Sequence, residues 1–373
     1  KFNYVRQWQM KAPVTDPLLV ADRPVEEAAT TTQYIDGLGR SVQAVSKQSS
    51  PLRKDVVAMN VYDDYGREVY KYLPFVSTQT GAGNGFTDDG NLKMNPIQQQ
   101  QLFMSNFYAA QGETFFYGRS DYESSPLEKS QRSFAAGNSW VGSRGSVREH
   151  AIIQQYLNNS IADAVKIFSI ELANGSIPTS SSNYAPGQLI KKVIIDENGI
   201  KTIEFIDKNE RVVLKKSQLA QNVTDGYAGW LSTFYVYDDI GHLRFVIPPK
   251  ATEALLSGIS LSTIANELCF RYEYDNKGRM IIKQVPGAAE VRMVYDARDR
   301  MVMMQDGNLR ANGKWMVSVF DDANRLKQTG LLIDAINSFE THQNLAATST
   351  TYPSLTSNFE LLTENYYDDY AWI

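Results

Sequence analysis

Aspartates recur along the chain in a short repeated unit, and a row of carboxylates is the first feature that could do chemistry. The unit is an apolar or aromatic residue, Asp, two variable residues, Gly or a substitute, and usually Arg. Such a row could bind calcium or act as acid and base. The copies are Asp36, Gly39 and Arg40; Asp63, Gly66 and Arg67; Asp196 and Gly199; Asp207 and Arg211; Asp238 and Gly241; Asp275, Gly278 and Arg279; Asp296 and Arg300; and Asp321, Asn324 and Arg325.

The fourth position of the unit indicates a structural role for these aspartates. Most copies have Gly there, Asp299 and Asn324 also tolerate positive φ, and only Glu210 departs from the pattern. Asp first and Gly fourth is typical of a type I turn, in which the carboxylate accepts hydrogen bonds from turn amides. We therefore predict that each unit is the tip of a β-hairpin with a G1 bulge, and that its carboxylate is not catalytic.

The basic residues after the turns form a second column, which could line a groove for an anionic ligand. A cation beside a turn carboxylate usually pairs locally or covers apolar surface with its stem. We expect that local role for Arg40, Arg67, Arg211, Arg279, Arg300 and Arg325.

Cysteine and histidine offer little further chemistry. Cys269 is the only cysteine and enters an expected strand, where a small buried hydrophobe is usual. His150, His242 and His342 share no metal-binding spacing. The glycine-rich segment 81–85 lacks the Lys of a phosphate-binding loop. We predict no catalytic residue, no metal site and no cofactor.

Aromatic residues are abundant, with 21 Tyr, 16 Phe and 5 Trp. Trp140, Trp230 and Trp315 could stack on sugars or on a peptide cargo. Aromatic pairs across strands are the structural alternative, which we favour.

Composition limits the partners. The net charge of -5 gives no basic excess to attract nucleic acid, so we expect no nucleic-acid partner. No run approaches the ~18 apolar residues of a membrane span. The sequence starts at Lys1 without an export signal, which we expect to have been removed or not included.

The segments around the units predict a mainly β fold, an antiparallel meander of hairpins with a few short helices. Residues beside the turns alternate or are β-branched and aromatic, and Pro74, Pro248 and Pro286 end several strands. Helices are expected after Asn95-Pro96, through Ile97, Leu102, Phe103 and Phe107, and over 251–268 with a break near Gly258.

We expect five regions along the chain. They are a lead-in segment (1–28), a first hairpin pair (29–75), an atypical module with loops and a short helix (76–187), a repeat array (188–332), and an incomplete repeat with a tail (333–373). The Ser-, Asn- and Pro-containing segment 173–186 is expected to be a loop that marks the clearest boundary.

Several of these motifs resemble a known family. Residues 62–67, 237–242 and 274–279 look like the YD repeats of Rhs and teneurin-type proteins. In addition, residues 34–40, 125–127, 196–199 and 246–249, with 285–287 and 305–307, resemble in order the N-terminal module that precedes the Rhs core in large exported proteins of the Bacteroidetes.

The resemblance implies a spiral shell or curved sheet that encloses or presents a C-terminal cargo such as a toxin. The partners would be the Rhs core and cargo of the same polypeptide, and the location secreted or cell surface. Residues 367–371 look like a further repeat cut off after its Asp, so we expect a fragment of a longer protein. Two other functions remain open: an adhesin or carbohydrate-binding module that uses surface aromatics and binds surface glycans, and a glycan-active enzyme with paired carboxylates.

Overall fold

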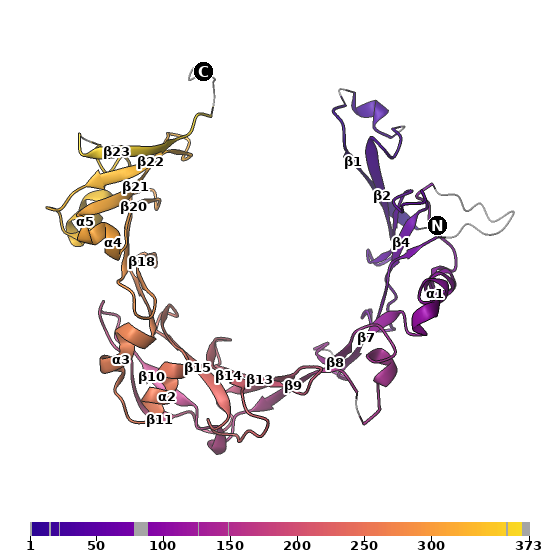
Figure 1. Cartoon of the computed structure of the whole chain (residues 1–373), viewed down its shortest axis with the longest axis horizontal. Helices are drawn as coiled ribbons and strands as arrows, with labels where there is room; N and C mark the ends of the chain where they lie inside the picture. The colour runs from indigo at the N-terminus through magenta and orange to yellow at the C-terminus, as the bar shows by residue number, and fades with distance from the viewer. Residues whose placement is uncertain are drawn as a thin grey trace. The chain divides into compact units, whose positions relative to one another are not determined.

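The computed structural model describes residues 2–14, 16–21, 23–77, 89–125, 127–147, 149–355 and 357–367. The chain divides into two compact units. Unit 1 comprises 1–156 and 193–201, and unit 2 comprises 157–192 and 202–373. Strands are the main element of both units, and the helices are short (Figure 1).

Unit 1 contains a five-stranded antiparallel sheet. Its order is β1 (Asn3–Met10), β2 (Ala28–Ile35), β3 (Ser41–Ser46), β4 (Val56–Met59) and β6 (Phe75–Val76). Buried and half-buried positions alternate along β2, as expected for a strand with one face on a core. The helix α1 (Pro96–Phe107) supplies Met104 to that core, which also contains Tyr34, Val45, Val57 and Phe75.

A second sheet has sixteen strands, and its order largely follows the sequence. It begins with β5 (Tyr70–Tyr72), β7 (Tyr117–Tyr122), β8 (Ser130–Phe134), β9 (Ile152–Asn158) and β12 (Ile190–Ile195). It continues with β13 (Lys201–Ile206), β14 (Val212–Gln218), β15 (Trp230–Tyr237), β16 (Leu243–Ile247), β17 (Phe270–Tyr274), β18 (Met280–Gln284), β19 (Val291–Tyr295), β20 (Met301–Gln305), β21 (Lys314–Phe320), β22 (Leu326–Ile333) and β23 (Phe359–Glu364).

The helices lie between these strands in sequence. They are α2 (Pro249–Leu256), α3 (Leu261–Leu268), α4 (Gly307–Ala311) and α5 (Phe339–Ala347), and the 3-10 turns are η1 (Pro17–Leu19), η2 (Ala109–Gln111), η3 (Val141–Ser143) and η4 (Ile161–Asp163). Gly258, at φ +93°, separates α2 from α3 as the sequence predicted. No helix in the described residues has the length and apolar character needed to cross a membrane.

The expectation of a mainly antiparallel meander with a few short helices is confirmed. Sequential strands pair because each turn folds the chain directly back onto itself. The five regions expected from the sequence are finer than the two units, and they stay a prediction.

Two local expectations were wrong. The segment 173–186 is not only a loop, because it contains β11 (Thr179–Asn183), which pairs with β10 (Lys166–Ser169). All five side chains of β11 are exposed, so the strand lacks the apolar alternation that would reveal it. In α1, Ile97, Leu102 and Phe107 are 46%, 57% and 66% exposed, whereas Gln100 and Met104 are buried. Of the four apolar residues named from the sequence, only Phe103 packs against the core, beside Met104.

Candidate functional site

Each of the eight repeated units forms a tight turn, which we call a corner and number by its Asp. At every corner the Asp amide donates to the carbonyl four residues later, and the fourth residue donates back to the Asp carbonyl. At corner 275, for example, these N···O distances are 3.0 Å to Arg279 and 2.9 Å from Gly278. The ladder register shifts next to most of these turns, as at Glu273/Tyr274, which is the signature of a bulge.

The Asp carboxylates accept hydrogen bonds from residues of their own corners. At corner 275 one carboxylate oxygen accepts from the amides of Lys277 and Arg279, at 2.9 and 3.0 Å, and the other accepts from Arg279 Nε at 2.7 Å. The same Nε contact recurs between Arg40, Arg67, Arg211, Arg300 and Arg325 and their aspartates, at 2.7–2.9 Å. At corners 196 and 238, Asp accepts from the amides of Ile200 and His242.

At five corners these contacts lower the pKa of the Asp carboxyl group. Burial alone would raise the pKa of Asp207 and Asp275, but hydrogen bonds from the Arg side chains and turn amides outweigh it and hold each pKa below its ordinary value. At Asp36 the Arg40 amide is the largest cause of a lowered pKa. A carboxylate held ionised in this way is a poor general acid or base near neutral pH.

The corners are linked to one another by their basic residues. The guanidinium of each corner Arg stacks on the aromatic ring that comes directly before the first residue of a later corner. Where that ring belongs to a Tyr, its hydroxyl donates to the backbone carbonyl of the residue after the Arg. Arg279 lies 4.9 Å from the centre of the Tyr295 ring, and Tyr295 Oη is 2.9 Å from the Met280 carbonyl oxygen. We call this repeated contact the corner ladder.

The same ladder contact recurs in both units. Its other rungs are Arg40 on Tyr62, Arg67 on Tyr122, Arg211 on Tyr237, Arg300 on Phe320 and Arg325 on Tyr367, at 4.4–5.0 Å, and His242 takes the place of Arg on Tyr274. The Arg column therefore joins neighbouring hairpins, as the local role expected from the sequence requires.

The ladder explains the residues at the fourth position. A Cβ at Gly66 would lie 3.0 Å from Arg40 Nη1, and one at Gly278 would lie 3.1 Å from His242 Nε2, so at these two corners the preceding basic residue would have to shift to admit a side chain. Asp299 instead accepts from Arg279, and Asn324 accepts from Arg300. Positive φ is shared by all of these positions.

Glu210, the one residue that broke the sequence pattern, fits the same rule. It has the left-handed φ of +61°. The preceding corner, at Asp196, has Ile200 where the others have Arg or His, so no guanidinium approaches Glu210 from that corner.

Sequence reasoning missed one corner, at Tyr122-Glu123. Tyr122 receives the Arg67 guanidinium, its hydroxyl lies 3.5 Å from the Glu68 carbonyl oxygen, and the register shifts between Asp121 and Tyr122. The Glu123 amide donates to Lys129, so the turn is longer than in the other units. Glu in place of Asp and this extra length hid the corner from a fixed-spacing search. The resemblance had pointed to 125–127, of which residue 126 is outside the described residues.

Two of the three candidate stacking tryptophans are buried. Trp230 is 9% and Trp315 2% exposed; Trp230 Nε1 donates to the Thr224 carbonyl, and Trp315 packs against His342. Burial of Trp315 speaks against its stacking on a ligand and fits the structural role that the sequence analysis favoured. Trp230 lines a cleft of about 630 Å³, so a stacking role for it stays a prediction. Trp140 is 37% exposed and packs on His150.

The remaining chemical candidates do not form a reactive site. In the described part of the chain, no group of three or more His, Cys, Asp or Glu side chains is placed to hold a metal ion. Cys269 is buried, and burial raises the pKa of its thiol to about 11. Segment 81–85 and residues 368–373 lie outside the described residues, so the phosphate-loop and final-repeat predictions there have no structural outcome beyond the Tyr367 rung.

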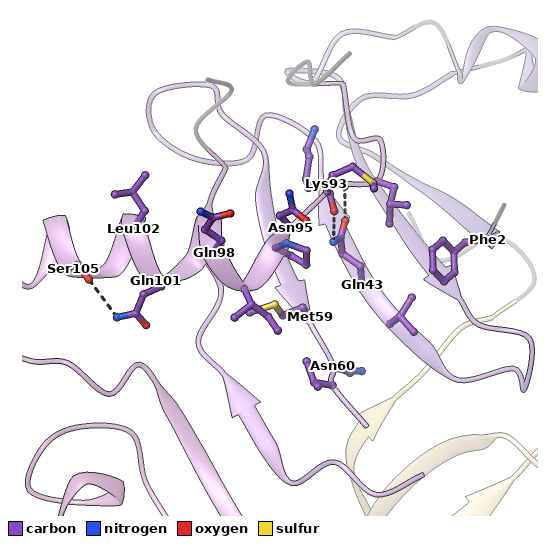
Figure 2. Close-up of a pocket in the computed structure, with 16 residues that line it drawn as sticks. Phe2, Gln43, Met59, Asn60, Lys93, Asn95, Gln98, Gln101, Leu102 and Ser105 are labelled. Atoms are coloured by element: carbon purple, nitrogen blue, oxygen red, sulfur yellow. Dashed lines mark hydrogen bonds between the residues drawn. The ribbon is translucent and has the colours of Figure 1, made fainter. Parts of the chain in front are cut away.

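A groove of about 1080 Å³ lies in unit 1 between α1 and strands β3 and β4. Its lining is mainly apolar, with Phe2, Met59 and Leu102 among the side chains, and Gln98 and Asn60 add carboxamides (Figure 2). The only ionisable lining residue is Lys93, so the described lining offers a binding surface without a carboxylate pair.

Lys93 is directed away from the groove into a buried ion pair that the sequence did not reveal. Its Nζ lies 2.6 Å from Asp55 Oδ2, and the two side chains are 1% and 0% exposed. The Lys93 backbone is held by both ends of the Gln43 carboxamide, at 2.7 and 3.0 Å (Figure 2). Asp55 also accepts from the amides of Gln48 and Gly90. The groove wall is therefore rigidly fixed to the sheet.

Residues 6–153 match the family model described as a domain of unknown function, DUF6443. None of the curated proteins matches the chain.

Solved structures of Tc toxin proteins resemble most of this chain in fold. A crystal structure of TcdB2-TccC3-TEV has a TM-score of 0.53 at 14% identity, over 94% of this chain and 16% of that chain. A Tc holotoxin pore of Photorhabdus luminescens with a TccC3 mutation has a TM-score of 0.53 at 14% identity, over 92% and 15%. TcdB2-TccC3 without its hypervariable C-terminal region has a TM-score of 0.51 at 14% identity, over 86% and 14%. The chain thus spans only a small part of these proteins, and the likeness concerns the fold.

Proposed function

We propose that the chain is a non-enzymatic scaffold, one segment of the wall of an exported YD-repeat shell of the Rhs type. In this proposal the rest of the polypeptide supplies the Rhs core and a C-terminal cargo, such as a toxin, that the shell encloses or presents. The shell would be secreted or displayed at the cell surface, as for the large Bacteroidetes proteins that the motifs resemble.

The corner ladder is the observation that carries this proposal. Every rung joins one hairpin to another, so successive repeats are fixed to each other by contacts that an isolated hairpin lacks. At the last described rung, Tyr367 already receives Arg325 and donates to the Leu326 carbonyl at 2.8 Å. Within each unit, hairpins held together in this way form a segment of wall. The fold likeness to Tc toxin structures supports the same function.

Protease protection of the cargo tests the proposal. The full-length polypeptide is digested before and after Arg279→Ala, which removes one rung. We expect the C-terminal cargo to resist digestion in the parent and to be cut faster in the variant. Arg53→Ala, at an exposed ion pair away from the ladder, is the control and should change nothing. A cargo that is digested equally in the parent and after deliberate unfolding would refute the shell.

The second candidate function is a carbohydrate-binding module or adhesin. The groove of unit 1 favours it, because carboxamides beside apolar side chains suit an uncharged sugar. Binding of the chain to a glycan array, lost on Gln98→Ala, would support this function over the shell.

A further inference from the structure

A cleft of about 460 Å³ beside β7 in unit 1 has four arginines in its lining. Arg67 comes from a corner, Arg119 from β7 and Arg132 from β8, and Arg144 follows η3. Asp121 is the only carboxylate of that lining. Arg67 pairs with Asp63 and Arg132 with Glu149, so the four arginines of this cleft meet three carboxylates and the cleft has an excess of one positive charge.

Arg67 is mostly engaged within its own corner. Its Nε and Nη2 lie 2.9 and 2.8 Å from Asp63 Oδ2, and its Nη1 donates to the Glu123 carbonyl at 3.2 Å. Its side chain is 16% exposed, whereas those of Arg132 and Arg144 are more open to solvent, so these two are the better placed to contact a ligand.

Arg119 and Arg144 share a single carboxylate. Arg119 Nε lies 2.8 Å from Asp121 Oδ1, and Arg144 Nε lies 2.8 Å from Oδ2. Burial alone would raise the pKa of Asp121, but the hydrogen bonds from Arg144 and Arg119 hold that pKa below its ordinary value, so the carboxylate carries one negative charge. Two guanidiniums around one carboxylate leave a net positive charge in the cleft.

Arg144 and Arg132 also keep donors open. Arg144 makes its bond through Nε, and neither of its terminal nitrogens bonds a described residue. Arg132 reaches Glu149 only through Nη1, at 3.3 Å. Their side chains are 44% and 47% exposed, so these donors are accessible from solvent.

The basic groups are also positioned in advance. Arg119 Nη1 donates to Tyr70 Oη at 2.9 Å, and its guanidinium lies 5.2 Å from the centre of that ring. The Asp121 carboxylate holds the Nε atoms of Arg119 and Arg144. A ligand would therefore meet guanidiniums whose directions are largely set before it binds, which lowers the entropic cost of binding.

We propose that this cleft binds an oxyanion, the carboxylate, sulfate or phosphate group of a small ligand or of a polymer, through Arg144 and Arg132. The planar fork of a guanidinium matches the paired oxygens of such groups. Arg119 and Asp121 position Arg144. The volume of the cleft is in the range of sites for small ligands.

Calorimetric titration of the whole chain at constant ionic strength tests the proposal, with sodium sulfate, sodium phosphate and sodium glucuronate as probes. We expect at least one of them to bind with a Kd below about 10 mM. Arg144→Gln and Arg132→Gln should each weaken that binding about tenfold or more, because each loses a charge-assisted fork. Arg53→Gln, whose partner Glu26 lies elsewhere in unit 1, is the matched control and should leave the Kd unchanged.

Arg144→Lys separates a built site from general attraction of anions. It keeps the charge but removes the fork, so we expect weaker binding with an unchanged melting temperature. A Kd equal to that of the parent in Arg144→Lys would overturn the proposal, as would no binding of any of the three anions. A preference for sulfate and phosphate identifies a tetrahedral oxyanion, and a preference for glucuronate identifies a carboxylate.

Discussion

Backbone conformation and the approach of a neighbour act together at the fourth residue of each corner. Gly278 and Gly199 have similar φ values of +75° and +83°, but only Gly278 faces a close side chain, His242. Substitutions at these two glycines therefore separate the free-energy cost of a positive φ from the cost of a close contact.

Gly278→Val is expected to destabilise the protein by ~1 to ~3 kcal/mol for the forced positive φ, and by more for the clash with His242. Gly199→Val meets nothing within 4 Å and should show the conformational cost alone. Urea unfolding measures both. Equal losses would mean that His242 simply moves away, and no loss at Gly278 would contradict the corner geometry.

Low pH should reduce the stability that the corner aspartates contribute to the fold. Because folding lowers the pKa of Asp207 and Asp275, the unfolded chain binds more protons than the folded one at low pH. The stabilisation is complete above the ordinary Asp pKa of about 4 and is lost as the pH falls through the folded values. The free energy of unfolding should therefore drop below pH ~4, and Asp275→Asn should reduce the size of that drop. The same drop in the variant and parent would show that corner 275 does not contribute.

Among the elements, the segment before α1 depends on one buried charge pair. Lys93→Met leaves the buried carboxyl group of Asp55 without its ion-pair partner, and we expect a loss of ~3 to ~5 kcal/mol. Arg53→Met removes an ion pair with Glu26 in which both side chains are more than half exposed, and it should cost no more than ~1 kcal/mol. Thermal unfolding compares the two. A similar small effect at both sites would show that Lys93 is not buried.

Neighbouring hairpins are joined by Tyr hydroxyls as well as by stacking. Tyr295→Phe removes the bond to the Met280 carbonyl and should cost ~0.5 to ~1.5 kcal/mol. Phe320 occupies the same rung position beside Arg300 but lacks a hydroxyl. We therefore expect Phe320→Tyr to be neutral or stabilising in the same unfolding assay. If Phe320→Tyr destabilises more than Tyr295→Phe, the two rungs are not equivalent.

For the molecule as a whole, each hairpin buries its apolar face against neighbours in sequence. In unit 2, Trp315 and Val317 of β21 pack with Leu332 of β22 and Ala346 of α5. A chain ending at residue 320 would expose this cluster, whereas one ending at 367 would keep it.

The chain that ends at 320 is therefore expected to aggregate or bind a hydrophobic dye, and the chain that ends at 367 to remain monodisperse. Size-exclusion chromatography and dye fluorescence measure this. A monodisperse, dye-free chain ending at 320 would show that the repeats are stable independently of their neighbours.

The sequence by itself determined the eight corners of fixed spacing and the antiparallel meander, because a type I turn with an αL residue is a local requirement satisfied within five residues. It also predicted α1 and the break at Gly258, where Pro and Gly act locally. What it did not reveal depends on contacts between distant residues.

Only the tertiary structure decided which aromatic ring each corner Arg stacks on and which charged side chains form ion pairs. The Arg67–Tyr122 rung, the Lys93–Asp55 pair and the open forks of Arg144 and Arg132 join residues tens of positions apart or depend on what surrounds them. Burial of Trp230 and Trp315 likewise follows from packing, and the identity of a single residue does not predict how it packs. The conformation of a turn is set by residues adjacent in sequence, whereas pairing across the sheet depends on register and on the shape of the folded chain.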